Sequence, residues 1–340
     1  MDITASPLRK HIKASPDCPS LPSSKTDNGH LSSFIMPPYV HTGPVDCSQD
    51  ADCSSLAGKT AIVTGGANGL GEAYVRALVA AGVYVCIGDI DTQKGPKLEA
   101  ELPGTKFIPC STGIWTDQVR LFEAAVTFSP TNRIHYVVAN AGIHRVDEIF
   151  QPGPDSLPEP DLSIIDINIK GPLYTAKLAM HHFIRQNGTT PTPEQEDTCL
   201  ILIGSGAAFL DVPRSPQYCA SKWAMRGIMH SLRRTAYYYG SRVNVISPWY
   251  VHTGILSDEA FAHCKRAGVE FATAEDAGRC LLRILADGRV NGHSFFVTAR
   301  KWAEKGFMDL DLEDFGDDAL LREVQEMQIC SAPAEAGLFV

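Results

Sequence analysis

The stretch AIVTGGANGLGEAYVRALVAAG, residues 61–82, joins a short run of apolar residues to a segment with helical periodicity. Four glycines stand at the join: Gly65, Gly66, Gly69 and Gly71. Glycine costs backbone entropy, so a chain retains it where a side chain would obstruct a turn or a ligand. The pattern predicts a strand, a tight turn and a helix whose free N–H groups would favour an anion.

The same alternation of strand and helix continues along the chain. Seven short apolar segments predict strands, beginning with the run before the glycines: 60–65, 83–89, 105–110, 134–140, 199–205, 242–248 and 293–299. Helical patterns between them cover Gly71–Ala81, Leu162–Arg185, Gln217–Tyr239 and Ala274–Ala286. Strands that alternate with helices indicate a parallel sheet covered on both faces. We therefore expect an α/β fold, a doubly wound Rossmann-type parallel sheet of about seven strands in a single domain.

The two ends of the chain differ from this central region. Residues 1–55 are rich in Ser and Pro without a sustained period, and we expect them to form a disordered extension. The exception is LSSFIMPPYV, residues 31–40, which is apolar enough to dock on a neighbour. Residues 56–300 are expected to form the folded domain. Residues 301–340 are expected to form an acidic tail with a helix near Asp317–Gln328.

Composition excludes several classes of function. The 340 residues carry a net charge of −9, which argues against a broad nucleic-acid surface. Without an apolar membrane span or a secretory signal, the expected location is cytoplasmic. The ten cysteines form no CxxC pair, and no metal site is predicted. Cys86, Cys110 and Cys199 are expected as reduced core thiols, while pairing of Cys47 with Cys53 stays open.

The glycine turn has two interpretations. It is either a tight connection without a ligand or a cradle for the pyrophosphate of a dinucleotide. Asp89, at the end of the second predicted strand, favours the dinucleotide because an acid at this spacing can hold ribose hydroxyls. Its charge would also repel the extra phosphate of NADP. The predicted cofactor is therefore NAD, with NADP less favoured.

Four residues downstream suggest proton transfer. Tyr218 and Lys222 stand four apart on a predicted helix, where a nearby ammonium would lower the pKa of the phenol. Ser205, at a predicted strand end, could bond a substrate oxygen. Asn168 in an apolar helix is either a satisfied buried amide or a holder of water on a proton path. Taken alone, the Tyr218–Lys222 spacing favours an amphipathic helix with a surface lysine.

These residues occur within an ordered series of motifs. The series comprises Thr64–Gly71, Asn140–Gly142, Asn168–Gly171, Ser205, Tyr218–Lys222 and Ser247–Thr253. From about residue 56 to residue 299 the chain resembles the short-chain dehydrogenase/reductase superfamily. Within it, SPWYVHTGI and FATAEDAGRCLLRIL resemble fungal secondary-metabolism members similar to 15-hydroxyprostaglandin dehydrogenase.

The resemblance implies roles for individual residues. The catalytic tetrad would be Asn168, Ser205, Tyr218 and Lys222. Cofactor contacts would come from Thr64, Gly65, Asn68, Gly69, Leu70, Gly71, Asp89, Ile90, Asn140, Ala141, Gly142, Tyr218, Lys222, Val251 and Thr253. A homodimer or homotetramer would form through the helices that hold Asn168 and Tyr218. Two positions depart from the family pattern: Ser111 replaces an Asp that contacts adenine, and Trp249 replaces a Gly.

The expected activity is that of an oxidoreductase acting on CH–OH groups with NAD (EC 1.1.1.-). It would interconvert a secondary alcohol and a ketone on a bulky apolar small molecule, as a step in fungal secondary-metabolite biosynthesis. Candidate walls of the substrate site are Phe209, Leu210, Trp249 and a mobile amphipathic lid at 254–268. Two alternatives stay open: an NADPH-dependent ketoreductase, and a catalytically idle dinucleotide-binding sensor or scaffold. An intact tetrad argues against an idle protein.

Overall fold

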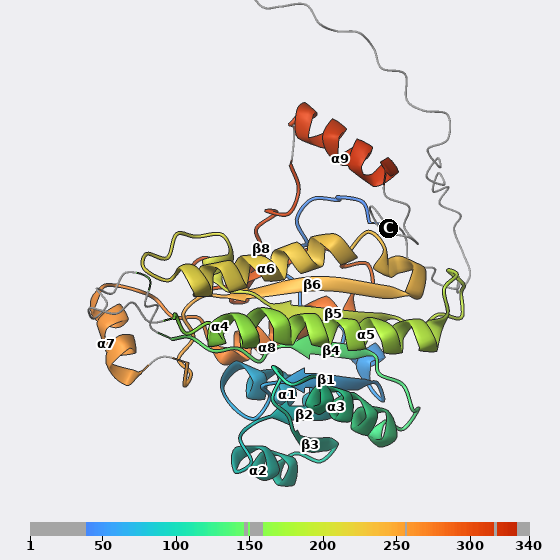
Figure 1. Ribbon diagram of the computed structural model, residues 1–340, viewed down its shortest axis with the longest axis horizontal. Helices are drawn as coiled ribbons and strands as arrows, with labels where there is room; N and C mark the ends of the chain where they lie inside the picture. Colours follow the sequence, from blue (N-terminus) through green and yellow to red (C-terminus); the bar gives the residue numbers. More distant parts are fainter. Residues whose placement is uncertain (1–38, 146–148, 150–158, 256, 316–317, 332–340) are drawn as a thin grey trace, which may run out of the picture. The chain divides into compact units, whose positions relative to one another are not determined.

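An eight-stranded sheet forms the centre of the computed structural model, which describes residues 39–145, 149, 159–255, 257–315 and 318–331 (Figure 1). Its strands are β1 (Thr60–Thr64), β2 (Tyr84–Asp89), β3 (Thr105–Pro109), β4 (Tyr136–Ala139), β5 (Thr198–Ile203), β6 (Ser241–Pro248), β7 (Ser294–Val297) and β8 (Phe307–Asp309). Their order is β3-β2-β1-β4-β5-β6-β7-β8, with β1 to β7 parallel and β8 antiparallel to β7. The predicted α/β fold is confirmed. The short β8 was not predicted, because three residues carry no readable period.

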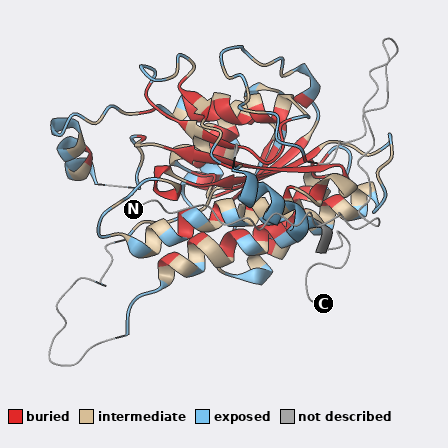
Figure 2. Cartoon of the chain, turned by 90° about the horizontal axis from the view of Figure 1, so that it is seen from above, coloured by how far each residue is buried: buried red, intermediate tan, exposed pale blue. Residues whose placement is uncertain are grey.

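Helices cover both faces of the sheet. They are α1 (Gly69–Ala80), α2 (Lys94–Glu101), α3 (Trp115–Phe128), α4 (Ser163–Ile165), α5 (Gly171–Asn187), α6 (Pro216–Leu232), α7 (Asp258–Arg266) and α8 (Ala274–Ala286). Helices α1 and α8 pack on one face, and α3, α5 and α6 on the other. Figure 2 shows the buried strands between these partly exposed helices. The strand order reverses at β1 and β4, which is where open α/β sheets bind ligands.

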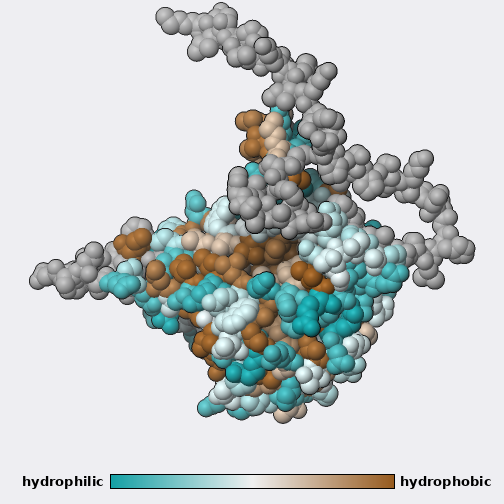
Figure 3. All heavy atoms as spheres, turned by 45° about the vertical axis from the view of Figure 1, so that its right-hand side comes forward, coloured by the Kyte–Doolittle hydropathy of each residue, from teal (hydrophilic) through white to brown (hydrophobic). Residues whose placement is uncertain are grey.

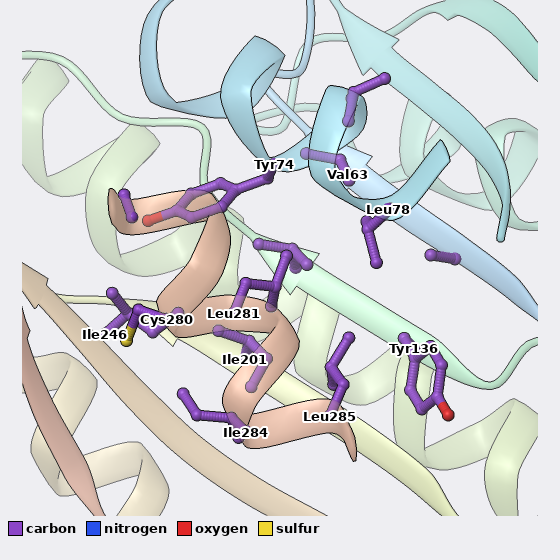
Figure 4. Close-up of a cluster of buried hydrophobic side chains, with 14 of the residues drawn as sticks. Val63, Tyr74, Leu78, Tyr136, Ile201, Ile246, Cys280, Leu281, Ile284 and Leu285 are labelled. Carbon is purple, nitrogen blue, oxygen red and sulfur yellow. The ribbon is translucent and has the colours of Figure 1, made fainter. Parts of the chain in front are cut away.

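The core beneath α1 and α8 fixes the glycine turn to the sheet. Tyr74 and Leu78 of α1 meet Leu281 and Leu285 of α8 over the strands (Figure 4). Each of these four side chains is at most 2% exposed. Truncating a Leu in such a core costs about 2–5 kcal/mol. The helix that follows the glycines is therefore held rigidly.

The predicted helix Leu162–Arg185 is interrupted in the structure. A π-helical turn, η3 (Asp166–Lys170), separates α4 from α5. Hydrophobic periodicity did not reveal it, because one inserted residue barely changes an apolar pattern. Such π turns occur frequently at functional sites. This one contains the buried Asn168.

Residues 39–55 pack on the fold instead of forming a disordered extension. The Tyr39 hydroxyl donates a hydrogen bond to Asp314, and the Arg233 guanidinium lies 4.1 Å from the Tyr39 ring centroid. The Val45 N–H donates to Asp309 at 3.0 Å. The predicted domain boundary at residue 56 is therefore too late, and residues 1–38 lie outside the described residues. Cys47 and Cys53, whose pairing the sequence left open, are free thiols in this segment.

The C-terminal boundary also shifts. Residues 301–314, predicted as tail, supply β8 and the carboxylates of Glu313 and Asp314, which contact α6. Helix α9 (Ala319–Ser331) belongs to a separate unit and agrees with the helix expected near its position. Among the described helices, none is both long and apolar enough to cross a membrane.

We predict that truncation will separate the two parts of the N-terminal region. Deleting residues 1–55 removes the Tyr39 and Val45 contacts, and loss of a buried aromatic anchor with its hydrogen bonds costs about 2–4 kcal/mol. We expect the melting temperature to fall by about 5–10 °C in a thermal scan. Deleting residues 1–38 is the matched control and should leave it unchanged. Equal melting temperatures for the two truncations would contradict a docked segment.

Candidate active site

The glycine turn between β1 and α1 has no room for side chains. A Cβ on Gly71 would lie 1.9 Å from the Gly65 carbonyl oxygen, and one on Gly65 would lie 2.7 Å from the Ala141 Cα. Gly65 and Gly69 also adopt positive φ angles, +62° and +58°, which other residues rarely accept. The turn therefore exposes backbone where a ligand can approach closely.

The N-terminus of α1 opens onto this turn. Asn68 is its N-cap residue, with extended backbone and a side chain that makes no capping hydrogen bond. The N–H groups of the first helical turn thus have no side-chain partner at the cap, and the helix dipole favours negative charge there. Leu70, by contrast, packs against the core beneath α1. A side-chain-free cradle facing an uncapped helix N-terminus fits the pyrophosphate of a dinucleotide.

Asn140 fixes the shape of the turn. Its side-chain amide donates to the carbonyls of Thr64, at 3.0 Å, and Gly65, at 2.9 Å. The Thr64 hydroxyl accepts the N–H groups of Asn140 and Ala141 at 3.1 and 3.2 Å. These bonds join the ends of β1 and β4. The Asn140 amide is therefore committed to the protein backbone, and Ala141 with Gly142 continues the wall of the cradle.

Asp89 lies at the rim of the turn. One carboxylate oxygen accepts the N–H of Ala67 at 2.9 Å, and the other accepts the N–H of Asp91 at 3.0 Å. Each oxygen keeps a further lone pair for a ligand. Among the described residues no cation pairs with it. The neighbouring Ile90 is 74% exposed, so an apolar side chain is free beside an unpaired negative charge.

Ser205 and Tyr218 come together at the end of β5. Ser205 caps the short 3₁₀ turn η4 (Gly206–Ala208), and its hydroxyl accepts the Ala207 N–H at 3.2 Å. A hydrogen bond also links the hydroxyls of Ser205 and Tyr218. Burial raises the pKa of Tyr218, and the bond from Ser205 lowers it only in part. The pKa is therefore raised overall, contrary to the lowering that the spacing to Lys222 predicted. Two hydroxyls thus share one point at the carboxyl edge of the sheet.

Lys222 lies between this pair and the cradle. Its Nζ donates to the Ile203 carbonyl at 3.1 Å and lies 5.6 Å from the Tyr218 ring centroid. A Cβ on Gly142 would lie 3.6 Å from the same Nζ, which places the ammonium beside the cradle wall. Burial lowers the pKa of Lys222 to about 8. Its remaining donors are available to the phenol or to a ligand.

Asn168 holds the loop after β4. Its Oδ1 accepts the Ile143 N–H at 2.8 Å, while its Nδ2 donates to the Ile143 carbonyl at 2.9 Å and to Ser221 Oγ at 3.2 Å. The side chain is thus a satisfied buried amide, one of the two alternatives that the sequence left open. Through Ser221 it also touches α6 between Tyr218 and Lys222.

The segment after β6 lies near both the glycine turn and Ser205. A Cβ on Gly69 would lie 3.3 Å from the Thr253 Cβ, so Thr253 adjoins the glycine turn. Val251 is buried in the core and forms a bridge with Ala272, so its side chain does not face the cradle. Trp249 lies 3.1 Å from the position of a Cβ on Gly206, next to Ser205.

The predicted walls of the substrate site separate into two groups. Leu210 and Trp249 both lie against Gly206 and therefore adjoin the Ser205 hydroxyl. Phe209 instead packs its ring edge-on against Phe296 at 5.2 Å. The region expected as a lid contains α7, at the left in Figure 1, whose Phe261 is buried against Phe271.

Two aromatic residues near Tyr218 were missed from the sequence. The His144 ring meets the Tyr218 ring edge-on at 5.0 Å, and burial lowers the pKa of His144. Tyr250 packs edge-on against Trp249 and hydrogen-bonds Cys264 of α7. The position of His144, two residues after the NAG motif, could have marked it. Within the described part of the chain, no group of His, Cys, Asp and Glu is arranged to hold a metal ion.

Comparisons with known proteins agree with this geometry. The short chain dehydrogenase family model matches residues 59–261. A 5'-hydroxyaverantin dehydrogenase of Emericella nidulans is 33% identical over 303 residues, which cover 83% of this chain and 96% of that protein. An NADP-dependent dehydrogenase of a Phoma species is 28% identical, with 80% and 84% covered. A short-chain dehydrogenase/reductase structure from Mycobacterium marinum shares the fold at a TM-score of 0.62 and 20% identity, covering 73% of this chain and 97% of that one. This chain belongs to the short-chain dehydrogenase family.

Proposed function

We propose that this chain is an NAD-dependent dehydrogenase that interconverts a secondary alcohol and a ketone on a bulky apolar small molecule. One observation carries the proposal. The hydrogen-bonded hydroxyls of Ser205 and Tyr218 lie beside a buried Lys222, which in turn adjoins the glycine cradle. A proton acceptor, a group that orients oxygen and a dinucleotide site are thus adjacent.

The chemistry divides between cofactor and protein. A bound nicotinamide dinucleotide supplies the hydride acceptor for the alcohol carbon. Tyr218 takes the hydroxyl proton, and Ser205 orients the oxygen by a hydrogen bond. The positive charge of Lys222 stabilises the phenolate form of Tyr218. Asn168 keeps the loop at Ile143 in register with α6, and we retain its predicted part in a proton path as a proposal.

The cofactor would lie along the cradle. Residues of the glycine turn would hold its pyrophosphate, Asp89 and Ile90 its adenosine, and Ala141, Gly142, Lys222 and Thr253 its nicotinamide half. Val251 would contact the cofactor only through its backbone, because its side chain is buried in the core. Asn140 would act by shaping the turn, since its amide is bonded to the backbone.

The substrate class follows from the walls of the site. Leu210, Trp249 and Tyr250 supply apolar and aromatic surface near Ser205 and Tyr218. The similarity to a 5'-hydroxyaverantin dehydrogenase supports a role in fungal secondary metabolism. The direct test mixes the protein with NAD and a panel of secondary alcohols that includes 5'-hydroxyaverantin, and follows NADH absorbance. Turnover only from ketones with NADPH would favour the ketoreductase, and dinucleotide binding without any turnover would favour a sensor.

We predict that Asp89 determines the choice of cofactor. Asp89→Asn keeps an acceptor for the Ala67 N–H but removes the charge that repels a 2′-phosphate. We expect kcat/KM for NAD to fall about tenfold while use of NADP improves relative to it. Steady-state kinetics with both cofactors measure the ratio of kcat/KM for NAD to kcat/KM for NADP. Asp91→Asn, two residues along, is the control and should leave this ratio unchanged. A wild type that already prefers NADP would contradict the argument.

We also propose a homodimer or homotetramer that forms through α5 and α6. Their outer surfaces expose Leu173, at 48%, and Trp223, at 51%. Figure 3 shows hydrophobic residues exposed among hydrophilic ones on the face it presents. Sedimentation at micromolar concentration should detect the oligomer, and Trp223→Glu should dissociate it. A purely monomeric wild type would contradict this proposal.

A cytosolic location remains our proposal. Cys47, Cys53, Cys86, Cys110, Cys199, Cys219, Cys264 and Cys280 are free thiols, as a reducing compartment would keep them.

A further inference from the structure

The C-terminal segment reaches α6 one turn beyond Lys222. There the Arg226 guanidinium forms three bonds with two different parts of the chain, Leu312–Glu313 and Ala208. Its Nε pairs with Glu313 Oε1 at 2.7 Å, its Nη2 donates to the Leu312 carbonyl at 3.0 Å, and its Nη1 donates to the Ala208 carbonyl at 2.9 Å. A planar guanidinium holds such partners in one fixed geometry.

The bond to Ala208 connects Arg226 to the active site. Ala208 ends the 3₁₀ turn η4, and its N–H donates to the carbonyl of Ser205 at 2.9 Å. The Ser205 hydroxyl caps the same turn. Arg226 is therefore hydrogen-bonded to the end of the three-residue turn η4, which follows Ser205 and its reacting hydroxyl. It projects from α6, the helix that carries the other hydroxyl, that of Tyr218.

Glu313 holds Arg226 in place. The Glu313 side chain is 5% exposed, and its second oxygen bonds His230 Nε2 at 2.5 Å. Burial would raise the pKa of Glu313, but hydrogen bonds from His230 and Arg226 bring it down to about 2. The carboxylate is therefore ionised at neutral pH and fully engaged. Arg226 is only 14% exposed and also lies 4.8 Å from the Trp223 ring centroid.

We propose that Arg226, held by Glu313, is a positioning residue that sets the distance between the Ser205 and Tyr218 hydroxyls for proton transfer. The inference rests on the proposed function of those two residues. Glu313 lies beyond residues 59–261, the part that the family model matches. A misplacement of about 1 Å between reacting groups can cost a hundredfold in rate, so a modest shift of η4 against α6 is sufficient.

The test separates positioning from stability. In Arg226→Met, kcat with NAD and the best alcohol of the panel should fall about 10- to 100-fold, while the Kd for NADH stays within about twofold. Arg226→Lys, which keeps the charge and one donor direction, should recover part of kcat. Asp314→Asn is the matched control: it removes a neighbouring contact between the C-terminal segment and α6, through Arg233 and Tyr39, far from η4. It should lower the melting temperature but keep kcat within about twofold.

Two results would overturn the inference. One is an Arg226→Met protein with kcat near that of the wild type, and the other is an equal loss of kcat in Asp314→Asn. If Arg226→Met does not fold, Glu313→Gln takes its place, since it keeps a neutral acceptor, and its kcat should fall several-fold. Tyr218→Phe is measured alongside. If that variant keeps its turnover, the proposed function itself fails, whereas an inactive Tyr218→Phe with a fully active Arg226→Met defeats only the inference.

Discussion

Tyr218→Phe is expected to lose turnover by about a hundredfold to ten-thousandfold while it still binds NADH. The substitution keeps the ring, so the edge-on contact with His144 and the proximity of Lys222 survive. It removes the Tyr218 hydroxyl, which is the proposed proton acceptor and is hydrogen-bonded to Ser205. Fluorescence titration with NADH and steady-state kinetics on the same preparation measure the two effects separately.

Two further variants bracket that result. Tyr84→Phe removes the hydroxyl of a half-exposed tyrosine on β2 and should change neither quantity. Lys222→Met should impair both, because it removes the charge that favours the phenolate and a proposed cofactor contact. A Tyr218→Phe protein that binds NADH normally and turns over within a few-fold of the wild type would refute the catalytic assignment.

Gly71→Ala is expected to have the largest effect on cofactor binding. The added methyl would lie 1.9 Å from the Gly65 carbonyl oxygen and 2.6 Å from the Asn140 amide nitrogen. Neither can withdraw, because they are bonded to each other at 2.9 Å. The turn must shift, at a cost of about 1–3 kcal/mol, and NADH affinity should fall about 10- to 100-fold. Titration with NADH and a thermal scan report the loss of affinity and of stability.

The matched control for this variant is Gly227→Ala. Gly227 is also a helical glycine, but a Cβ there meets nothing within 4 Å. Alanine in a helix is favoured over glycine by about 1 kcal/mol, so this variant should bind NADH normally and melt no lower. Normal NADH affinity in Gly71→Ala would show that the glycine turn does not hold the cofactor.

Much of the fold could be read from the sequence because its signals are local. Buried parallel strands are short continuous apolar runs, and seven of them were found in order. The π turn at Asn168 escaped detection because it adds one residue to an otherwise helical pattern. The packing of residues 39–55 escaped for another reason. Tyr39 and Asp314 are 275 positions apart, and no local pattern reports such a pair.

The same distinction holds for the candidate site. The glycine turn, Asp89 and the Tyr218–Lys222 spacing are local signals, and the structure places them around one edge of the sheet. His144 needed the structure, because a single histidine carries no period. Arg226 shares a helix face with Lys222, so its inward position could be expected. Its partner Glu313 could not, since one acidic residue in an acidic segment looks like any other.

The contacts of Tyr39 and Val45 with Asp314 and Asp309 affect when the protein can fold during its synthesis. Tyr39 leaves the ribosome early, whereas Asp314 follows 275 residues later, roughly 15–55 s at usual rates of synthesis. The ion pair between Arg226 and Glu313 likewise cannot form until Glu313, 87 residues further along, has been synthesised. During that interval the guanidiniums of α6 have no carboxylate partners, and the nascent domain is a sheet without its last strand. The fold is therefore completed only after residues 307–314 are synthesised, when β8 and the two carboxylates become available together.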